Sequence, residues 1–331
     1  MNEKMKILVA YDGSDCSKEA IKDLRRAGLP RESEALAVSV CETALPLPEA
    51  TTPTSNLVNV PKAKLIAYEI EARAEEARAQ ILRAVEEAHK LAEEAAQQLK
   101  SDFPGWNVRA EAMVGTPAPA VIKEAHDWNA DLIVVGTHGR SALGRLLMGS
   151  VSQRVAAEAH CSVRVGRWPV EKTDSPTRIV VGVDGSLRAL VAVREVALRA
   201  WPAGSEALVI AANNYHEPSG IVRMPSAAPK AALERTAEEE TLSPQNLIEL
   251  VEEDLRAVAG LHVVSEIREG DPKRVLISEA NTFDADCIFV GSSGSNSGLE
   301  RHTLGSVSAA VANGAHCSVE VVRARRTTGV T

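Results

Sequence analysis

The stretch DLIVVGTHGRSALGRLLMGS, residues 131–150, is the most informative part of this chain, because an apolar run leads directly into a glycine-rich loop. A second version, DCIFVGSSGSNSGLERHTLGS, occupies residues 286–306, so the two versions begin 155 residues apart (131 and 286). A short apolar run of this kind is typical of a buried parallel strand. The chain therefore contains the same unit twice.

The first strands of the two units repeat as well. ILVAYDGS at 7–14 matches IVVGVDGS at 179–186, 172 residues apart (12 and 184), so the first unit is longer in its middle. A length of 331 residues also suits two domains of about 150 residues each. We predict domains at 1–167 and 178–331, joined by a linker at 168–177.

Composition excludes several classes of protein. Hydrophobic residues make up 45% of the chain, enough for a core in each half, and the net charge of −8 with a pI near 5.6 gives no footprint for nucleic acid. Lys4 and Lys6 lead straight into a short strand, and no apolar run approaches the roughly 20 residues that span a bilayer. The expectation is a cytoplasmic protein without membrane contact, and its five cysteines, an odd number with no C-x-x-C pair, are expected to be buried thiols.

Strands and helices alternate along each unit. Alternation of this kind requires right-handed crossovers and a parallel sheet covered by helices on both faces, so each unit is expected to be a doubly wound α/β domain with a five-stranded parallel sheet. Ligands of such sheets bind at the carboxyl ends of the strands. The expected strands of the first unit are 7–10, 35–41, 108–114, 132–135 and 162–165, its helices are 14–27, 63–100, 117–126 and 149–159, and the strands of the second unit are 179–183, 207–212, 262–267, 287–290 and 318–322.

The segment 63–100 carries apolar residues at helical spacing, from Ile70 through Ile81 and Leu91 to Leu99, with Glu, Arg and Lys between them. One long amphipathic helix is predicted. Many seam positions are Ala, so packing against the domain's own sheet is favoured over a coiled-coil arm. The preceding segment 43–61, rich in Pro and Thr, is predicted to be a mobile loop.

The spacing of Gly136, Gly139, Gly149 and Ser150 favours a phosphate site. Glycines let the backbone turn tightly and approach an anion without a Cβ in the way, and the loop runs into a helix N-terminus. The free N–H groups and the Ser150 hydroxyl would donate to phosphate oxygens. A plain turn is the alternative, and repetition of the full spacing favours phosphate binding over it.

The chain resembles the tandem type of the universal stress protein family (UspA-like) over nearly all its length. The likeness rests on VAYDGS at 9–14, VGTP at 114–117 and residues 131–155. The corresponding segments of the second unit are VGVDGS at 181–186, EGDP at 269–272 and GSVSAAV at 305–311. The family has adenine-nucleotide-binding α/β folds, and its G-x-x-G-x9-G-[S/T] motif marks members that bind ATP. The resemblance implies an ATP site in the first unit, with Mg²⁺ as an optional companion.

The resemblance also implies the residues of that site. Asp12 matches the acidic residue beside the adenosine, with a helix N-cap or turn former as its alternative, and Val40 matches the apolar contact of adenine. His138 is expected to contribute backbone rather than imidazole, and Arg140 lies within the loop, where it can also be simply solvated. The complete set for the first unit is Ala10, Asp12, Val40, Val135, Gly136, His138, Gly139, Arg140, Gly149, Ser150, Val151 and Ser152.

The second unit departs from the motif. Ten residues separate Gly294 from Gly305 where the first unit has nine between its glycines, and Ala212 stands in place of Val40. Nucleotide binding there stays open. The residues concerned are Asp184, Gly291, Gly294, Gly305 and Ser306.

Three functions remain open at this point. The favoured one is a binding module in a stress response, in which adenine nucleotide alters contacts with protein partners. A slow ATPase or nucleotide hydrolase, with Asp12 and Asp15 holding Mg²⁺, and a ligand-free scaffold are the alternatives.

The repeated His-Cys-Ser-Val at 160–163 and 316–319 suggests how the two units meet. Each copy belongs to a last strand, and members of the resembled family commonly dimerise through that strand. We predict an internal pseudo-dimer in which these strands pair, with further homodimerisation open. The His-Cys pairs are expected to pack in the core rather than to bind zinc.

Overall fold

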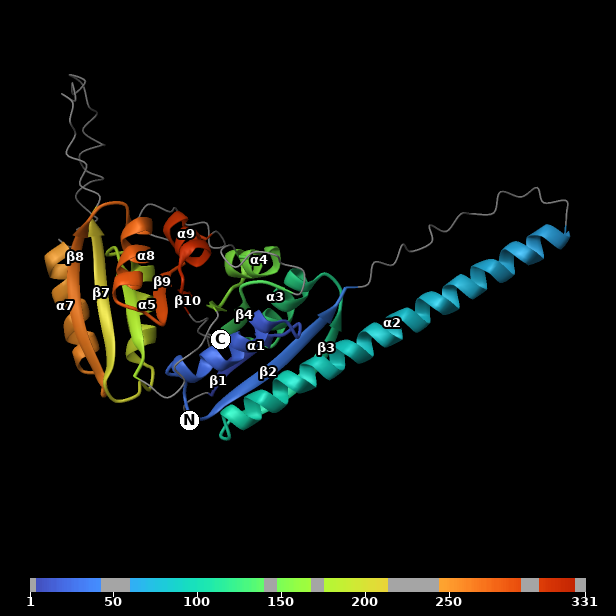
Figure 1. Ribbon diagram of the computed structural model, residues 1–331, viewed down its shortest axis with the longest axis horizontal. Helices are drawn as coiled ribbons and strands as arrows, with labels where there is room; N and C mark the ends of the chain where they lie inside the picture. Colours follow the sequence, from blue (N-terminus) through green and yellow to red (C-terminus); the bar gives the residue numbers. More distant parts are fainter. Residues whose placement is uncertain are drawn as a thin grey trace, which may run out of the picture.

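The computed structural model describes residues 4–42, 60–139, 148–167, 176–213, 244–292 and 304–324, and of residues 60–74 and 213 it describes the backbone only. Of the predicted loop at 43–61, residues 43–59 lie outside the described residues, and residues 60 and 61 belong to a helix instead of the loop. Of the predicted linker at 168–177, the structure describes residues 176 and 177. The two predicted doubly wound units are confirmed, and their helices and strands are labelled in Figure 1.

The first half has the predicted order of elements, namely β1 (Met5–Ala10), α1 (Asp15–Asp23), β2 (Ser33–Cys41), α2 (Val60–Asp102), β3 (Asn107–Val114), α3 (Pro117–Asp127), β4 (Leu132–Gly136), α4 (Ser150–Glu158) and β5 (Ser162–Gly166). The second half repeats it with β6 (Arg178–Val183), α5 (Leu187–Ala197), β7 (Ser205–Asn213), α7 (Pro244–Arg256), β8 (Leu261–Glu269), α8 (Pro272–Thr282), β9 (Cys287–Gly291), α9 (Ser306–Gly314) and β10 (Ser318–Val322).

Both halves contribute to a single ten-stranded sheet of order β3-β2-β1-β4-β5-β10-β9-β6-β7-β8. Strands are parallel within each half, and β5 meets β10 in antiparallel pairing, with Val163 opposite Val321 and Arg164 opposite Glu320. The predicted internal pseudo-dimer is confirmed. Within the first half the winding reverses between β1 and β4, and the carboxyl ends of these strands are where a ligand is expected.

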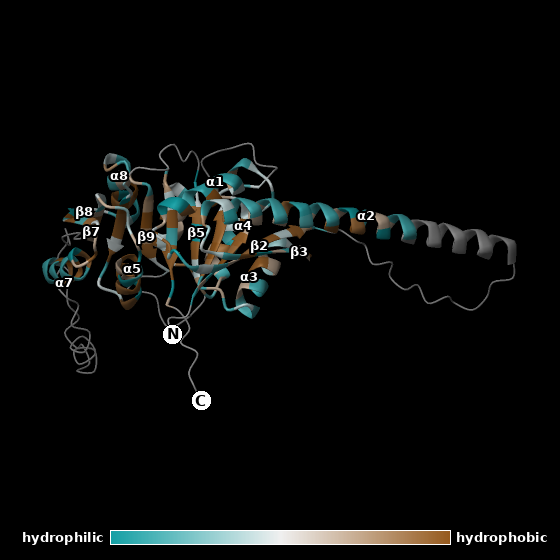
Figure 2. Cartoon of the chain, turned by 90° about the horizontal axis from the view of Figure 1, so that it is seen from below, coloured by the Kyte–Doolittle hydropathy of each residue, from teal (hydrophilic) through white to brown (hydrophobic). Residues whose placement is uncertain are grey.

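Helices cover both faces of the sheet, as predicted. One continuous core lies under α3, α4, α8 and α9 and crosses the junction between the halves, with Val121, Val155, Leu276 and Val311 among its members. The opposite face has two separate cores, one under α1 and α2 and one under α5 and α7. Figure 2 shows the hydrophobic strands enclosed between these layers.

Among the side chains of α2 that the structure describes, from residue 75 onward, those of the C-terminal part pack on the sheet. Ala88, Ala92, Ala95, Ala96 and Leu99 are buried against the core, whereas no side chain within residues 75–87 is buried and Leu82 is 70% exposed. The helix therefore runs well past the sheet edge (Figures 1 and 2). The prediction that it packs against its own domain is right for its last turns, and the described apolar positions farther upstream, such as Ile81, are not buried.

A buried group of charges joins the halves on the α1 and α5 side. Arg164 donates from Nε to Asp23 at 2.6 Å and from one terminal nitrogen to Glu320 at 3.1 Å, and Arg199 also donates to Glu320. Arg199 in turn lies 3.5 Å from Glu195. We call these five residues the junction cluster. Burial opposes the charge on Arg164, yet its neighbours, Asp23 first among them, raise the pKa of its guanidinium well above the ordinary value.

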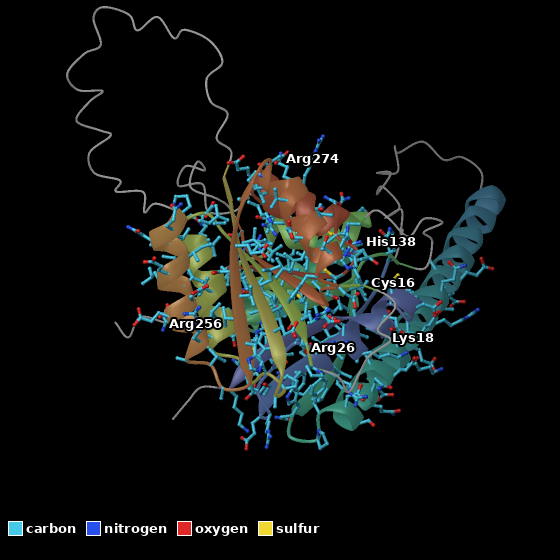
Figure 3. The ribbon with its side chains drawn as sticks, turned by 60° about the vertical axis from the view of Figure 1, so that its left-hand side comes forward. Cys16, Lys18, Arg26, His138, Arg256 and Arg274 are labelled. Carbon is cyan, nitrogen blue, oxygen red and sulfur yellow. The ribbon has the colours of Figure 1, made fainter. Side chains whose placement is uncertain are left out.

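A second link between the halves lies beside this cluster. Arg26 donates to the carboxylate of Asp286 and to the carbonyl of Pro176, and it lies in the region where the halves meet (Figure 3). The two halves are thus held by ion pairs as well as by strand pairing.

Candidate nucleotide site

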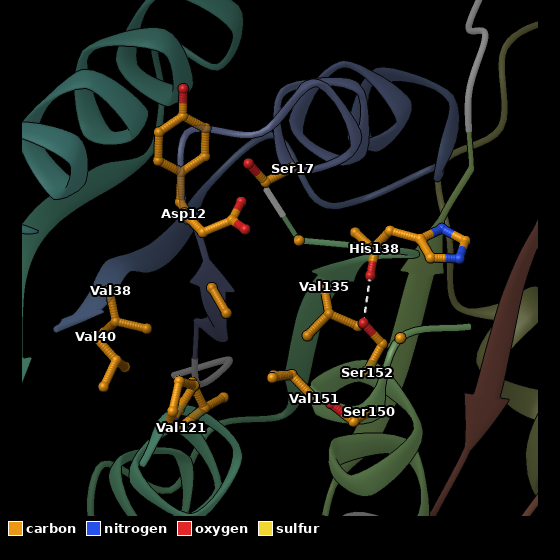
Figure 4. Close-up of a pocket in the computed structure, with 16 residues that line it drawn as sticks. Asp12, Ser17, Val38, Val40, Val121, Val135, His138, Ser150, Val151 and Ser152 are labelled. Carbon is orange, nitrogen blue, oxygen red and sulfur yellow. Dashed lines mark hydrogen bonds between the residues drawn. The ribbon is translucent and has the colours of Figure 1, made fainter. Parts of the chain in front are cut away.

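A cavity of about 280 Å³ lies at the carboxyl ends of the first half's strands, where α3 and α4 approach (Figure 4). Every described residue of the predicted first-unit set lines it, and only Arg140 lies outside the described residues. The lining residues are Ala10, Tyr11, Asp12, Ser17, Val38, Val40, Pro117, Val121, Val135, Gly136, His138, Gly139, Gly149, Ser150, Val151 and Ser152.

One end of the cavity is apolar. Val38 and Val40 project from the same face of β2, because they are two residues apart on a strand, and Val121 faces them from α3 (Figure 4). The side chains are small and branched, so they form a smooth wall. Such a wall suits a flat, uncharged ring rather than a charged group.

The other end of the cavity is the N-terminus of α4. The first intrahelical bond of α4 runs from the Gln153 N–H to the Gly149 carbonyl at 2.9 Å. The N–H groups of Ser150, Val151 and Ser152 precede that bond and have no intrahelical acceptor. These three residues line the cavity, so their backbone donors and the positive end of the helix dipole favour an anion there.

The glycines of the motif have different roles in this structure. A Cβ on Gly136 would lie 2.8 Å from the backbone carbonyl of Cys16, so Gly136 lets the start of α1 approach β4. Among the described residues, a Cβ on Gly139 would meet Asp12 Oδ2 alone, at 3.0 Å. The Gly149 N–H donates to the Thr137 carbonyl at 2.7 Å, so it is not among the free donors that the sequence suggested.

Asp12 combines the two roles that the sequence left open. Its Oδ1 accepts from the Ser14 backbone N–H at 3.0 Å and from the Ser14 hydroxyl at 2.6 Å, which is a turn-forming role. Ser14, and not Asp12, is the N-cap of α1, since its side chain accepts from the Ser17 N–H. The same Asp12 carboxylate lines the cavity, with Oδ2 towards Gly139.

His138 follows β4 at the carboxyl edge of the sheet (Figure 3). Its imidazole points away from Val38 and Val40 in Figure 4. Burial, followed by the nearby charge of Arg167, lowers the pKa of His138 below its ordinary value of 6.5. The ring is therefore neutral at pH 7 and adds no positive charge to the cavity.

The second half repeats the backbone framework of the site. The Gly305 N–H donates to the Ser292 carbonyl at 2.7 Å, as Gly149 does to Thr137, and Ser308 donates to the Gly291 carbonyl at 2.6 Å, as Ser152 does to Gly136. Ser306 begins α9 as Ser150 begins α4. The extra residue of the second loop leaves this frame intact, and Gly294 lies outside the described residues.

The apolar end differs between the halves. Gly182 replaces Ala10, and a Cβ there would lie 3.0 Å from a methyl group of Leu276, the counterpart of Val121. The larger side chain of Leu276 therefore lies close to the position that corresponds to the Ala10 side chain in the first half. Asp184, the counterpart of Asp12, accepts from the Ser186 N–H at 3.0 Å but is exposed.

Five lining residues were missed from the sequence, namely Tyr11, Ser17, Val38, Pro117 and Val121. Strand and helix periodicity carried a signal for two of them, since Val38 shares a face with Val40 and Val121 lies one helical turn after Pro117. Tyr11 follows β1 directly, and its hydroxyl donates to Glu94 of α2 at 2.6 Å, a long-range contact that no local pattern indicates.

The structure also bears on other sites that the sequence raised. Among the described residues no three His, Cys, Asp or Glu side chains gather in a way that could hold a metal ion. Burial raises the pKa of both Cys161 and Cys317 to about 12, so these thiols stay protonated. Within the described part of the chain, none of the helices has the length and apolar content needed to cross a bilayer.

Known proteins are similar to this chain in sequence and in fold. A universal stress protein of Methanocaldococcus jannaschii is 31% identical over 166 residues, which cover 50% of this chain and 82% of the relative. A universal stress protein of Mycobacterium tuberculosis is 31% identical over 223 residues, 66% of this chain and 69% of the relative.

A solved universal stress protein from Archaeoglobus fulgidus aligns over 96% of this chain and 98% of its own length, with a TM-score of 0.60 and 20% identity, which shows the shared fold. The model of the universal stress protein family matches residues 4–167 and again residues 176–323. The chain therefore belongs to the universal stress protein family and carries two tandem copies of its domain.

Proposed function

We propose that the first half binds adenine nucleotide, ATP above all, and that the chain acts by nucleotide-dependent contacts with protein partners in a cytoplasmic stress response. The observation that carries the proposal is the two-ended cavity, with a wall of valines at one end and free helix N-terminal donors at the other. Adenine is flat and apolar on its faces, and a phosphate chain is a polyanion. The nucleotide therefore matches the cavity at both ends.

The individual residues have distinct parts in this proposal. Val38, Val40 and Val121 enclose the base, and the amides of Ser150 to Ser152 receive the phosphates. Asp12 lines the cavity with its Oδ2 towards Gly139, and this oxygen can accept from the ribose or hold Mg²⁺ that arrives with the phosphates.

We further propose one occupied site per chain. Leu276 lies beside Gly182 in the second half, and Ala212 replaces Val40, so the wall that would face a base has a different shape there and is not the valine wall of the first half. The helix N-terminus of the second half is intact, but an anion site alone does not select adenine nucleotide. A titration should accordingly saturate at a single nucleotide per chain.

Binding rather than turnover is favoured by the same geometry. Hydrolysis needs a base that activates water beside the phosphates. Asp12 Oδ1 already accepts two hydrogen bonds from Ser14, which hold this carboxylate in a turn-forming role. Purified protein should retain nucleotide in stoichiometric amount without releasing appreciable product.

A thermal-shift titration with ATP tests the proposal. Ligand at about 100 times its Kd stabilises the folded state by about 2.7 kcal/mol, which should raise the melting temperature by several degrees. Gly139→Val should abolish the shift, because Gly139 lines the cavity and the added side chain would occupy space beside Asp12 Oδ2. Val264→Thr, at an exposed position of β8, is the control and should leave the shift unchanged. A wild-type protein that neither shifts with ATP nor carries nucleotide through purification would overturn the proposal.

A further inference from the structure

The helix α4 connects the first-half cavity to the second half of the chain. Its first residues, Ser150 to Ser152, line the cavity. At its other end, Arg323, which follows β10, donates to the Ala156 carbonyl at 2.5 Å and to the Cys161 carbonyl at 3.3 Å. A side chain of the second half therefore caps the helix that carries the anion end of the first-half cavity.

This cap supplies a positive charge that the last turn of α4 lacks. The last turn, which ends at Glu158, contains no basic residue. Burial lowers the pKa of Arg323 to about 10, so the guanidinium is still charged at neutral pH. A cation at the carboxyl end of a helix complements its dipole and occupies carbonyls that would otherwise lack partners.

A reciprocal contact and a second link strengthen the connection. Arg167, the counterpart of Arg323, donates to the Ala312 carbonyl at the end of α9, so each half caps a helix of the other. The Gln153 side chain donates to the Met148 carbonyl at 2.8 Å, directly before Gly149, and to Asn313 of α9 at 3.2 Å. Figure 1 shows α4 and α9 side by side at this junction.

We propose that Arg323 is a positioning residue of the first-half nucleotide site and couples nucleotide binding to the junction between the halves. The inference rests on the proposed function. By holding the carboxyl end of α4, Arg323 fixes where the amides of Ser150 to Ser152 point. Coupling is reciprocal, so phosphates at the start of α4 tighten the Arg323 cap at its end.

Calorimetric titration with ATP tests this coupling in the full chain. Arg323→Met keeps the length of the side chain and removes its charge and donors, and it should weaken ATP binding about threefold to tenfold. Arg323→Lys should restore part of the affinity, because it returns the cation. The matched control is Arg154→Met, which removes an equal charge from α4 at a half-exposed position paired with Glu158 and should change affinity less than about twofold.

The outcomes separate the two proposals. Absence of ATP binding by the wild type would overturn the proposed function and this inference with it. Wild-type binding with Arg323→Met within about twofold of it, or with Arg154→Met equally weakened, would overturn the inference alone.

A measurement on folded wild-type protein covers the case in which Arg323→Met does not fold. Hydrogen exchange should slow on addition of ATP at residues 318–324, where Arg323 follows β10, and Gly139→Val should remove that slowing. Exchange there that ATP leaves unchanged, while the wild type binds ATP, would overturn the inference.

Discussion

Replacing Arg164 with Met should destabilise the chain more than any other single change in the junction cluster. The cluster contains three carboxylates, Asp23, Glu195 and Glu320, and two guanidinium groups, Arg164 and Arg199, and each of the five is at least nine-tenths buried. Loss of Arg164 leaves the three carboxylates with one guanidinium. Asp23 also loses the nitrogen that lies 2.6 Å from it.

The expected magnitude follows from that imbalance. Removing one partner of a buried ion pair costs about 3–5 kcal/mol, because the remaining charge stays out of water without compensation. Glu320→Gln is the matched change. It leaves two charges of each sign and keeps an amide oxygen as acceptor, so its cost should be nearer that of a lost hydrogen bond, about 1–3 kcal/mol.

Urea unfolding followed by circular dichroism gives both numbers from the shift of the midpoint. Arg164→Met should unfold at a clearly lower urea concentration than Glu320→Gln, and both below the wild type. If Arg164→Met cost less than about 1 kcal/mol, or if Glu320→Gln cost more than Arg164→Met, this accounting of buried charge would be wrong.

Three further predictions follow from the glycines, the long helix and His138. Gly136→Ala should cost about 2 kcal/mol or more in unfolding experiments, since its Cβ would overlap the Cys16 carbonyl, whereas Gly139→Ala should fold normally. Leu99→Ala, at a fully buried position of α2, should lower the free energy of unfolding by about 2–5 kcal/mol. Leu82→Ala, at a position that is 70% exposed, should change it by less than about 0.5 kcal/mol. Equal effects of the two changes would contradict the observation that Leu99 is buried against the core and Leu82 is not. His138→Ala should leave ATP affinity at pH 7.5 within about twofold of the wild type, because its lowered pKa keeps the ring neutral there. As pH falls through that pKa the ring gains charge, so wild-type affinity should rise relative to His138→Ala, and parallel pH profiles would refute this.

Much of the fold could be predicted because its signals are local. Apolar runs such as Leu132 to Val135 identify buried strands from a few residues, and their alternation with helical periodicity specifies parallel pairing. The pairing of β5 with β10 was also predictable, since the repeated His-Cys-Ser-Val placed two equivalent edge strands in one chain. The periodicity of α2, by contrast, specifies a helix but not where the sheet beneath it ends.

Most of the residues that line the first-half cavity could be predicted from the sequence, but the contacts that each of them makes could not. Spacing alone placed Gly136 and Gly149 in a phosphate cradle. The structure shows that the space at Gly136 is taken by the start of α1 and that the Gly149 N–H is bonded to Thr137. Both facts depend on contacts between segments that are distant in sequence or on the path of a loop. The junction cluster was missed for the same reason, because Asp23, Arg164 and Glu320 come together only in the folded chain.

Arg164 and Glu320 occupy the same position of the repeated strand and face each other across the junction. If two first halves paired through this strand, a buried arginine would face a buried arginine. If two second halves paired in the same way, a buried glutamate would face a buried glutamate. Neither half retains the self-complementary edge that an ancestral single-domain dimer requires. A chain shortened to one repeat would consequently bring two buried like charges together if it dimerised through this strand, so loss of one repeat would also cost the chain this interface.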